Sequence, residues 1–247
     1  MKLSGKHALV TGGARGIGAA ISRALTAQGA RVTVLSRTPQ SVDFECEAIS
    51  ADVADPQAVA LAFRSVVQRS GPIHILVNNA GQAASAPFLK TGAQLWRQML
   101  AVNLDGVFHC TQAALPGMLE AGWGRIVNVA STAGLAGYAY VSAYCAAKHA
   151  VIGLTRALAL ELAGKGITAN AVCPGYTATD MTQETIANIV AKTGRSAEQA
   201  IAALVERNPQ KRLIEPDEVA SAVAWLCLPE SQALTGQAIA VAGGEIM

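Results

Sequence analysis

Three side chains between positions 131 and 148 have the types and spacing of a proton-transfer site. Ser131 precedes Tyr144 by thirteen residues, and Lys148 follows Tyr144 by four. Residues four apart share one face of a helix, so a helix here would direct a phenol and an ammonium to one point. A positive neighbour favours the phenolate, and use near neutral pH requires the tyrosine pKa to fall well below its usual ~10. A serine hydroxyl could hold a carbonyl or alkoxide oxygen beside the phenol, which predicts carbonyl and alcohol chemistry.

A glycine-rich segment near the N-terminus has the features of a phosphate-binding loop. TGGARGIG (11–18) directly follows an apolar, β-branched run and opens a helical pattern. Glycines let the backbone approach a pyrophosphate, and the helix N-terminus supplies free N–H groups and a positive dipole end. This context favours dinucleotide binding over a plain turn, with S-adenosylmethionine as the competing ligand class. The cofactor contacts expected here are Gly12, Arg15, Gly16, Ile17 and Gly18.

The end of the second predicted strand indicates which dinucleotide binds. NAD sites tend to place Asp or Glu there to hold the ribose hydroxyls, whereas this chain reads LSRT (35–38) and has no acid. Arg37 and Arg15 could instead bind a 2′-phosphate, although Arg37 could also be an ordinary surface arginine. The sequence predicts NADP(H), with NAD(H) as the alternative.

Apolar, β-branched runs alternate with longer helical patterns along the whole chain. Near-continuous apolar runs favour strands covered on both faces, as in a parallel sheet. No linker or repeat interrupts the alternation, so we expect a single α/β domain over 1–247. It would be a doubly wound Rossmann domain with about seven parallel strands and helices on both faces. Strands are predicted at 7–11, 31–35, 46–53, 73–77, 125–129, 167–172 and 238–241, and helices at 17–28, 56–70, 95–120, 143–163 and 217–227.

Two connections depart from this alternation. Nine residues (38–46) join the second and third strands, too few for an ordinary helical crossover, so we expect a helix of one or two turns. Residues 181–213 are long instead, and read as helix, Gly194 and a second helix with Ser196 as its N-cap. We expect this segment to be a flap over the substrate cleft. Its Ala, Leu and Ile content predicts an apolar substrate body.

Composition excludes several classes of partner. The net charge is +2 without a basic tract or an acidic tail, which argues against nucleic acid and acidic membranes. Five scattered cysteines without a C-x-x-C pair, and four histidines without shared spacing, predict no metal site and favour reduced thiols. The chain shows neither an apolar signal segment nor a run near the ~18 residues of a membrane span. We expect a cytoplasmic protein.

These motifs, in this order and strand context, resemble the short-chain dehydrogenase/reductase family across essentially the full length. The resemblance implies that Tyr144 is the general acid/base and that Lys148 lowers its pKa and holds the nicotinamide ribose. Ser131 would bind the substrate oxygen, and Asn103 would anchor a water in the proton relay. From the residues alone, a helix kink or cap explains Asn103 equally well. The matching pieces are TGGARGIG (11–18), Asp52-Val53, Asn78-Asn79-Ala80-Gly81, Asn103, Ser131, Tyr144, Lys148 and Pro174-Gly175.

The same resemblance implies the remaining cofactor contacts. Asp52 and Val53 would meet the adenine. The segment after the sixth strand would cover the nicotinamide carboxamide, with Thr177 in a slot that is aliphatic in many relatives. The contacts expected in these regions are Asp52, Val53, Asn78, Ala80 and Gly81 along the adenosine, and Pro174, Gly175, Thr177 and Thr179 at the nicotinamide.

Resemblance and cofactor prediction together favour an NADP(H)-dependent ketoreductase for a 3-oxoacyl thioester or a related ketone. The small-molecule substrate would be its main partner, and two long helices from each subunit would build a homotetramer. The alternative is an NAD-dependent dehydrogenase of the 3-hydroxybutyrate type, which has a similar flap, but Ala133 offers no polar contact to a small carboxylate. A third hypothesis is a dinucleotide-binding sensor without turnover. It is disfavoured because such proteins typically lose the tyrosine or the lysine, and this chain has both Tyr144 and Lys148.

Overall fold

Seven parallel strands form one sheet in the order β3-β2-β1-β4-β5-β6-β7. The computed structural model describes residues 1–38 and 46–247. The chain starts at β1, winds outward to β3, and then crosses to β4 and winds the other way, so strand order reverses between β1 and β4. The predicted doubly wound Rossmann fold is confirmed. The strands are β1 (His7–Thr11), β2 (Arg31–Ser36), β3 (Glu47–Ser50), β4 (Ile75–Asn78), β5 (Gly124–Val129), β6 (Ile167–Pro174) and β7 (Ala238–Val241).

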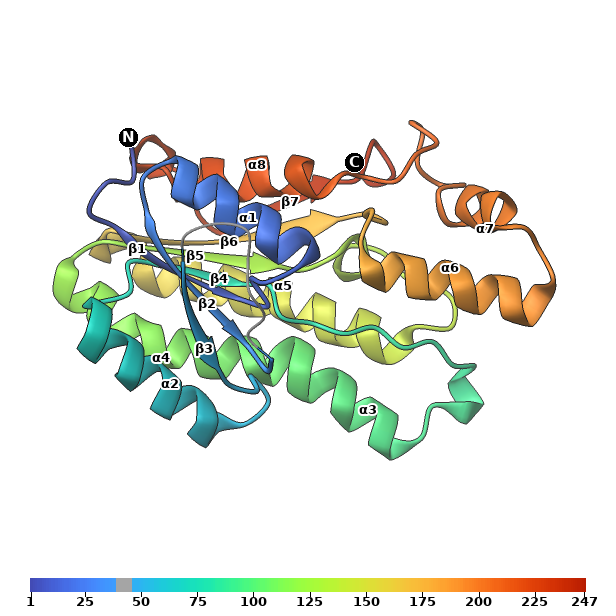
Figure 1. The fold of residues 1–247 in the computed structure, drawn as a ribbon, viewed down its shortest axis with the longest axis horizontal. Helices are drawn as coiled ribbons and strands as arrows, with labels where there is room; N and C mark the ends of the chain where they lie inside the picture. The colour runs from blue at the N-terminus through green and yellow to red at the C-terminus, as the bar shows by residue number, and fades with distance from the viewer. Residues whose placement is uncertain (39–45) are drawn as a thin grey trace.

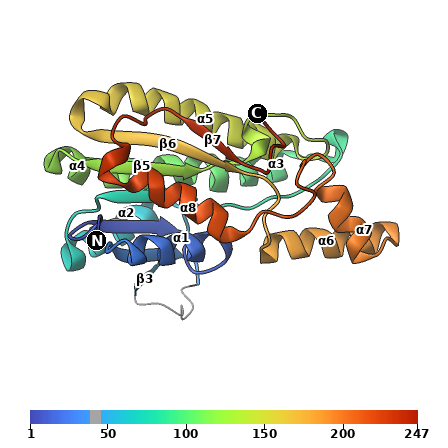
Figure 2. The ribbon, with the colours of Figure 1, turned by 90° about the horizontal axis from the view of Figure 1, so that it is seen from above.

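Helices cover both faces of this sheet (Figure 1). On one face α1 (Gly16–Ala27) packs beside α8 (Pro216–Cys227), and α2 (Pro56–Ser70), α4 (Gly106–Ala121) and α5 (Ser142–Leu162) lie on the other. Figure 2 shows the same layers from above. Because each central strand is buried on both sides, β1, β4, β5 and β6 are buried at every position, as the apolar runs predict.

Local signals set the helix boundaries. Asp55 caps α2 by accepting hydrogen bonds from the N–H groups of Gln57 and Ala58, and Pro56 occupies the first turn, where its missing N–H costs nothing. Gly122 ends α4 in the left-handed conformation, with φ 60°.

The predicted helix over 95–120 is interrupted. The structure has α3 (Ala93–Leu100), a π-helical turn (Ala101–Asp105) and then α4. The amide of Asn103 inserts here and donates a hydrogen bond to the backbone oxygen of Met99, 2.9 Å away. An inserted side-chain contact of this kind widens a helix locally, and such turns recur at functional sites.

The segment predicted as a flap contains two helices that project beyond the sheet. These are α6 (Asp180–Thr193) and α7 (Ala197–Leu204), drawn in orange in Figure 1. Gly194 ends α6 with φ 69°, and Ser196 forms a reciprocal capping box with Gln199, so the helix–glycine–helix prediction is confirmed. The short helix expected between β2 and β3 falls on 39–45, outside the described residues. No helix of the described part is long and apolar enough to cross a membrane.

Candidate active site

A cavity of about 1100 Å³ opens at the carboxyl edge of the sheet, where strand order reverses. Ligands of open α/β sheets bind at this position. All but one of the residues predicted to form the site line this cavity. They are Gly12, Arg15, Gly16, Ile17, Gly18, Arg37, Asp52, Val53, Ala80, Gly81, Asn103, Ser131, Tyr144, Lys148, Pro174, Gly175, Thr177 and Thr179.

Ser131, Tyr144 and Lys148 converge on one wall of the cavity. Ser131 lies two residues after the end of β5, and its hydroxyl oxygen accepts a hydrogen bond from the Ala133 N–H at 3.1 Å. The O–H of Ser131 therefore remains available to donate, and it contacts the Tyr144 phenol. The Lys148 ammonium is one helical turn further along α5, 5.7 Å from the centre of the Tyr144 ring.

The titration of these groups corrects one expectation. Burial raises the pKa of Tyr144 to about 12, and the contact with Ser131 offsets only part of this rise. Burial also lowers the pKa of Lys148 to about 8. The Lys148 ammonium donates to the Val129 carbonyl oxygen at 2.8 Å, at the end of β5. The predicted lowering of the tyrosine pKa is not found in this structure, because desolvation of the phenol outweighs the effect of the nearby charge.

Lys148 gives protein stability a pH dependence that can be measured. Its pKa is lower in the folded chain than the ordinary 10.5, so between pH 8 and 10.5 the unfolded chain binds a proton that the folded chain lacks. Lys148 therefore makes a contribution to the free energy of unfolding that rises with pH through this window, by about 1–2 kcal/mol between pH 7.5 and 9.5. Urea unfolding at each pH measures it as the difference in pH slope between wild type and the Lys148→Met variant, which lacks this contribution. Equal pH slopes for variant and wild type would contradict the assignment.

The glycine-rich loop has the shape of a phosphate cradle. Arg15 precedes α1 without capping it by a side-chain hydrogen bond, so the first turn keeps N–H groups for a ligand. A Cβ atom on Gly18 would lie 2.1 Å from the Gly12 carbonyl oxygen, and one on Gly12 would lie 3.1 Å from the Asn79 amide. Only glycine allows this close approach, which fits the backbone to a pyrophosphate.

Asn79 holds this loop in place, a role that the sequence analysis did not assign. Its side-chain amide donates to the carbonyl oxygens of Thr11 and Gly12, at 3.0 and 3.2 Å. Asn78, the predicted contact, does not line the cavity, because adjacent residues of a strand point to opposite faces. Its amide instead donates to Thr111 and Asn128 in a buried network that joins β4, β5 and α4. Through this network Asn78 ties β4 to its neighbours in the core.

Two arginines line the cavity, Arg15 in the glycine-rich loop and Arg37 directly after β2. Arg15 and Arg37 are both exposed, and neither has an ion-pair partner among the described residues. Among the described residues that line the cavity next to Arg37, the acid is Asp52, and one of its oxygens already accepts from the Ala54 N–H at 2.9 Å. The described part of this region therefore offers two free cations to an anionic ligand.

Asn103 is fully buried against the loop that follows β4. Its amide donates to the Gln82 carbonyl oxygen at 2.9 Å, and its oxygen accepts from the Gln82 N–H at 3.2 Å. This arrangement matches the helix-kink alternative, with the side chain fixing residue 82. Asn103 and Lys148 both approach Gly81, so the two side chains lie close together. A Cβ atom added to Gly81 would be 2.9 Å from the Asn103 oxygen and 3.8 Å from the Lys148 ammonium.

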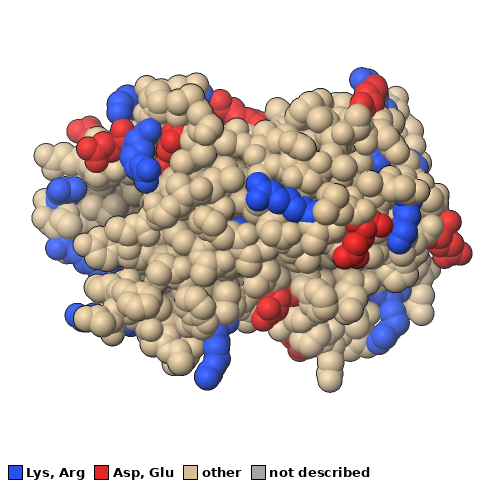
Figure 3. Space-filling view, turned by 180° about the vertical axis from the view of Figure 1, so that it is seen from behind, with Lys and Arg blue, Asp and Glu red and all other residues tan. Residues whose placement is uncertain are grey.

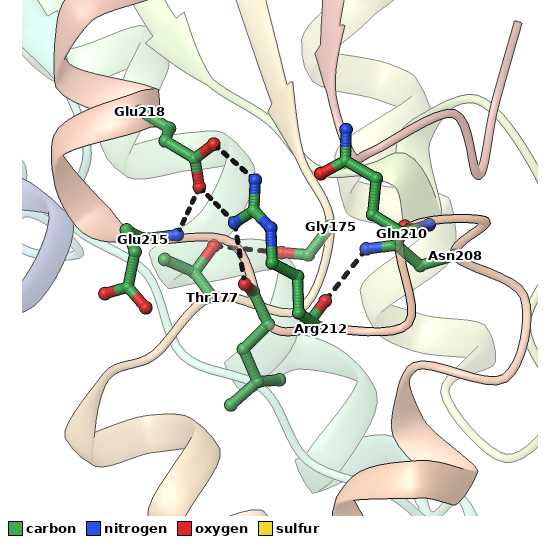
Figure 4. Close-up of polar contacts among 8 residues, drawn as sticks. Gly175, Thr177, Asn208, Gln210, Arg212, Glu215 and Glu218 are labelled. Carbon is green, nitrogen blue, oxygen red and sulfur yellow. Dashed lines mark hydrogen bonds and ion pairs between the residues drawn. The ribbon is translucent and has the colours of Figure 1, made fainter.

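The segment after β6 is anchored to Ile214, directly after the flap. The Ile214 N–H donates to the Tyr176 carbonyl oxygen at 2.9 Å, and the Ala178 N–H donates to the Ile214 carbonyl oxygen at 2.8 Å. Arg212 forms a two-pronged ion pair with Glu218 at the start of α8, at 2.6 and 2.7 Å (Figure 4), which lowers the pKa of Glu218 to about 2. The two flanks of the flap are thus tied to each other, and its C-terminal end is tied to α8.

Thr177 contributes its backbone to this anchor. Its buried hydroxyl donates to the Gly175 carbonyl oxygen at 3.0 Å, within its own turn. A threonine at this position therefore satisfies its polar group locally, and it takes the place of an aliphatic residue without leaving an unpaired hydroxyl.

Tyr138 is a second cavity residue that the sequence analysis missed. Its hydroxyl donates to Glu245 close to the C-terminus, and the Arg207 guanidinium lies 5.1 Å from its ring centre. Burial and the Glu245 carboxylate raise the pKa of Tyr138 to about 12. These contacts join three segments that are 38 to 107 positions apart, and no local motif signals them.

Comparison with known proteins places this arrangement in context. Residues 6–190 match the family model of the short chain dehydrogenases. A Streptomyces coelicolor protein named for ketoacyl reduction is 40% identical, over 96% of this chain and 95% of its own. The D-beta-hydroxybutyrate dehydrogenase of Cupriavidus necator is 37% identical, over 98% of each chain. A crystal structure of an actinorhodin polyketide ketoreductase variant with NADPH has a TM-score of 0.93 and 38% identity, and the match covers 99% of this chain and 98% of that one.

Proposed function

This chain belongs to the short-chain dehydrogenase family, and we propose that it is an NADP(H)-dependent ketoreductase that reduces a 3-oxoacyl thioester or a related ketone to a secondary alcohol. The observation that carries the proposal is the convergence of Ser131, Tyr144 and Lys148 on the cavity that also contains the glycine cradle. The relatives named for ketoacyl reduction, at about this length and identity, support it.

The cavity residues divide the chemistry among them. Bound NADPH would supply the hydride to the carbonyl carbon. Ser131 donates its free O–H to the substrate oxygen and so polarises the carbonyl. Tyr144, whose raised pKa keeps it protonated at neutral pH, then donates its proton to that oxygen. Lys148 stabilises the phenolate that remains, and a water held near Asn103 would return a proton from solvent.

Residues around the cradle would hold the dinucleotide. The free N–H groups at the start of α1 would donate hydrogen bonds to the pyrophosphate. Asp52 and Val53 would contact the adenine. Ala80 and Gly81 would line the adenosine ribose, and Lys148 the nicotinamide ribose. The backbone of 174–179 would cover the carboxamide.

Cofactor preference provides a direct test of Arg37. Wild-type enzyme should use NADPH in preference to NADH, because Arg37 and Arg15 can pair with a 2′-phosphate. The Arg37→Asp variant should lower kcat/KM for NADPH by about 10- to 100-fold with little loss for NADH, since a charge-assisted phosphate contact is worth about 1.5–3 kcal/mol. Initial rates with both cofactors measure this. Arg64→Asp, on the exposed side of α2, is the control.

The control variant should keep the wild-type cofactor ratio. A wild-type preference for NADH would overturn the NADP(H) assignment and favour the second candidate, an NAD-dependent 3-hydroxyacid dehydrogenase. Similarity to D-beta-hydroxybutyrate dehydrogenase supports that candidate. We rank it second because Ala133, buried beside Ser131, offers no polar group to a small carboxylate.

We also propose that the chain is a single domain, 1–247, that works as a cytoplasmic homotetramer. The single seven-stranded sheet supports one domain, and five free cysteines suit a reducing compartment. Phe108 and Leu119 on α4 and Leu160 on α5 are 41–86% exposed, which suits burial between subunits. On the face in Figure 3 charges of both signs are scattered, which agrees with a small-molecule substrate and does not suggest nucleic acid.

A further inference from the structure

The side of α6 that borders the cavity is largely polar. Glu184, Thr185, Asn188 and Lys192 line the same cavity as Tyr144, at the three- and four-residue spacing that places side chains on one helical face. Met181 and Ile189 are the apolar members of this face. The apolar substrate body predicted from the composition of the flap therefore meets a wall that is mostly polar.

Three of these side chains, all exposed, have hydrogen-bonding capacity that the protein does not use. Within the described residues, the Glu184 carboxylate, the Asn188 amide and the Lys192 ammonium have no hydrogen-bond or ion-pair partner. Thr185, by contrast, donates its hydroxyl to the Met181 carbonyl oxygen of its own helix at 2.9 Å. An asparagine amide can donate and accept hydrogen bonds, so it can pair with an amide group of a ligand. A lysine ammonium only donates and carries a positive charge, so it binds anions.

The charges along α6 give this face a direction. Asp180 and Glu184 lie in its first turns, and the helix begins next to the glycine loop, where a Cβ on Gly16 would be 3.2 Å from the Thr179 methyl group. Lys192 lies eight residues beyond Glu184, about 12 Å along the helix axis. An anionic group on the substrate would be repelled near the first turns and attracted at the last.

From this geometry, and resting on the ketoreductase function proposed above, we propose that α6 binds the long polar arm of an acyl thioester. The arm would run outward from Tyr144, with its amides at Asn188 and its phosphate at Lys192. This chemistry is shared by a free coenzyme A thioester and by a phosphopantetheine arm on a carrier protein. A ketone without such an arm would leave both side chains unused.

Substrates that differ only in the arm test this proposal. Acetoacetyl-coenzyme A has amides and phosphate, acetoacetyl-pantetheine has amides without phosphate, and acetoacetyl-N-acetylcysteamine has one amide. Lys192→Gln should raise KM about fivefold for the coenzyme A ester, the scale of a partly exposed ion pair, with kcat unchanged and no effect on the other two esters. Asn188→Ala should raise KM for the coenzyme A and pantetheine esters only.

The control is Lys165→Gln, in the turn (Ala163–Lys165) that follows α5 and outside the cavity lining, which should leave all three KM values unchanged. A KM rise of equal size for all three esters would overturn the proposal, and so would the absence of a rise for all three esters and for the acetoacetyl carrier protein. Acetoacetyl groups on a carrier protein separate the two sources: a Lys192→Gln effect on the carrier substrate alone identifies the protein-bound arm, and an effect on the free ester alone identifies coenzyme A.

Failure of the proposed function gives a different result. If wild-type enzyme reduces none of the three esters, the ketoreductase assignment falls, yet α6 can still be tested by binding. Calorimetric titration of the NADP(H)-loaded enzyme with phosphopantetheine should then give a Kd about fivefold weaker for Lys192→Gln than for wild type. Equal Kd values would reject the arm site as well.

Discussion

The Tyr144→Phe variant is expected to lose about 10²- to 10⁴-fold in kcat/KM for ketone reduction, the usual contribution of a general acid. The substitution removes one oxygen and keeps the ring, so the packing of α5 against η3 (Thr132–Gly134) is retained. Steady-state rates at saturating NADPH measure the loss. The loss should fall mainly in kcat, because the proton moves only in the transition state.

Cofactor binding separates this result from misfolding. The Tyr144→Phe protein should bind NADPH with a Kd within about threefold of wild type, because the glycine cradle lies on different elements, β1 and α1. If the variant keeps near wild-type turnover while binding NADPH, Tyr144 is not the acid. A wild-type protein that binds NADPH but turns over no ketone or alcohol would instead support the sensor reading.

The Gly18→Ala variant is expected to lose NADPH affinity by about 100-fold or more. The new Cβ would lie 2.1 Å from the Gly12 carbonyl oxygen and 2.6 Å from the Asn79 amide, so backbone must move out of the cradle. Displaced N–H groups no longer point at the pyrophosphate, and two or more such hydrogen bonds at about 1.5 kcal/mol each give this loss. Fluorescence titration of NADPH measures it.

Gly164→Ala is the matched control. Gly164 lies in the turn after α5 and has no positive φ, and a Cβ added there would have no other atom within 4 Å. The same added methyl group should therefore leave NADPH affinity unchanged there and leave stability equal or slightly higher. Similar affinity losses in both variants would show that the Gly18 effect does not come from the cradle.

Most of the elements follow from local patterns in the sequence. The strands β1 and β7 and the helix α2 match the predicted ranges residue for residue, because hydrophobic period and capping residues act over a few positions. Tyr144 and Lys148 share the cavity because one helix carries both, and helical geometry fixes their relation without knowledge of the rest of the chain.

The remaining features depend on contacts between distant segments. Asn78 and Asn79 are adjacent and identical, and only the orientation of β4 decides that Asn79 faces the glycine loop. The break in the predicted 95–120 helix depends on Asn103, whose amide donates a hydrogen bond to the backbone carbonyl oxygen of Gln82, 21 positions away. The Tyr144 pKa depends on desolvation by the whole wall of the cavity, which spacing in the sequence cannot report.

The contact between Tyr138 and Glu245 has a practical consequence for work with this protein. Glu245 is two residues from the last position, and Gly243 packs so closely against Asn208 that a Cβ there would lie 2.3 Å from the amide oxygen. A purification tag fused after Met247 is therefore expected to disturb the side of the active-site cavity that Tyr138 lines. Met1 does not line that cavity, and its side chain lies near Gly29. Fusions for immobilisation or crystallography are best made at that end.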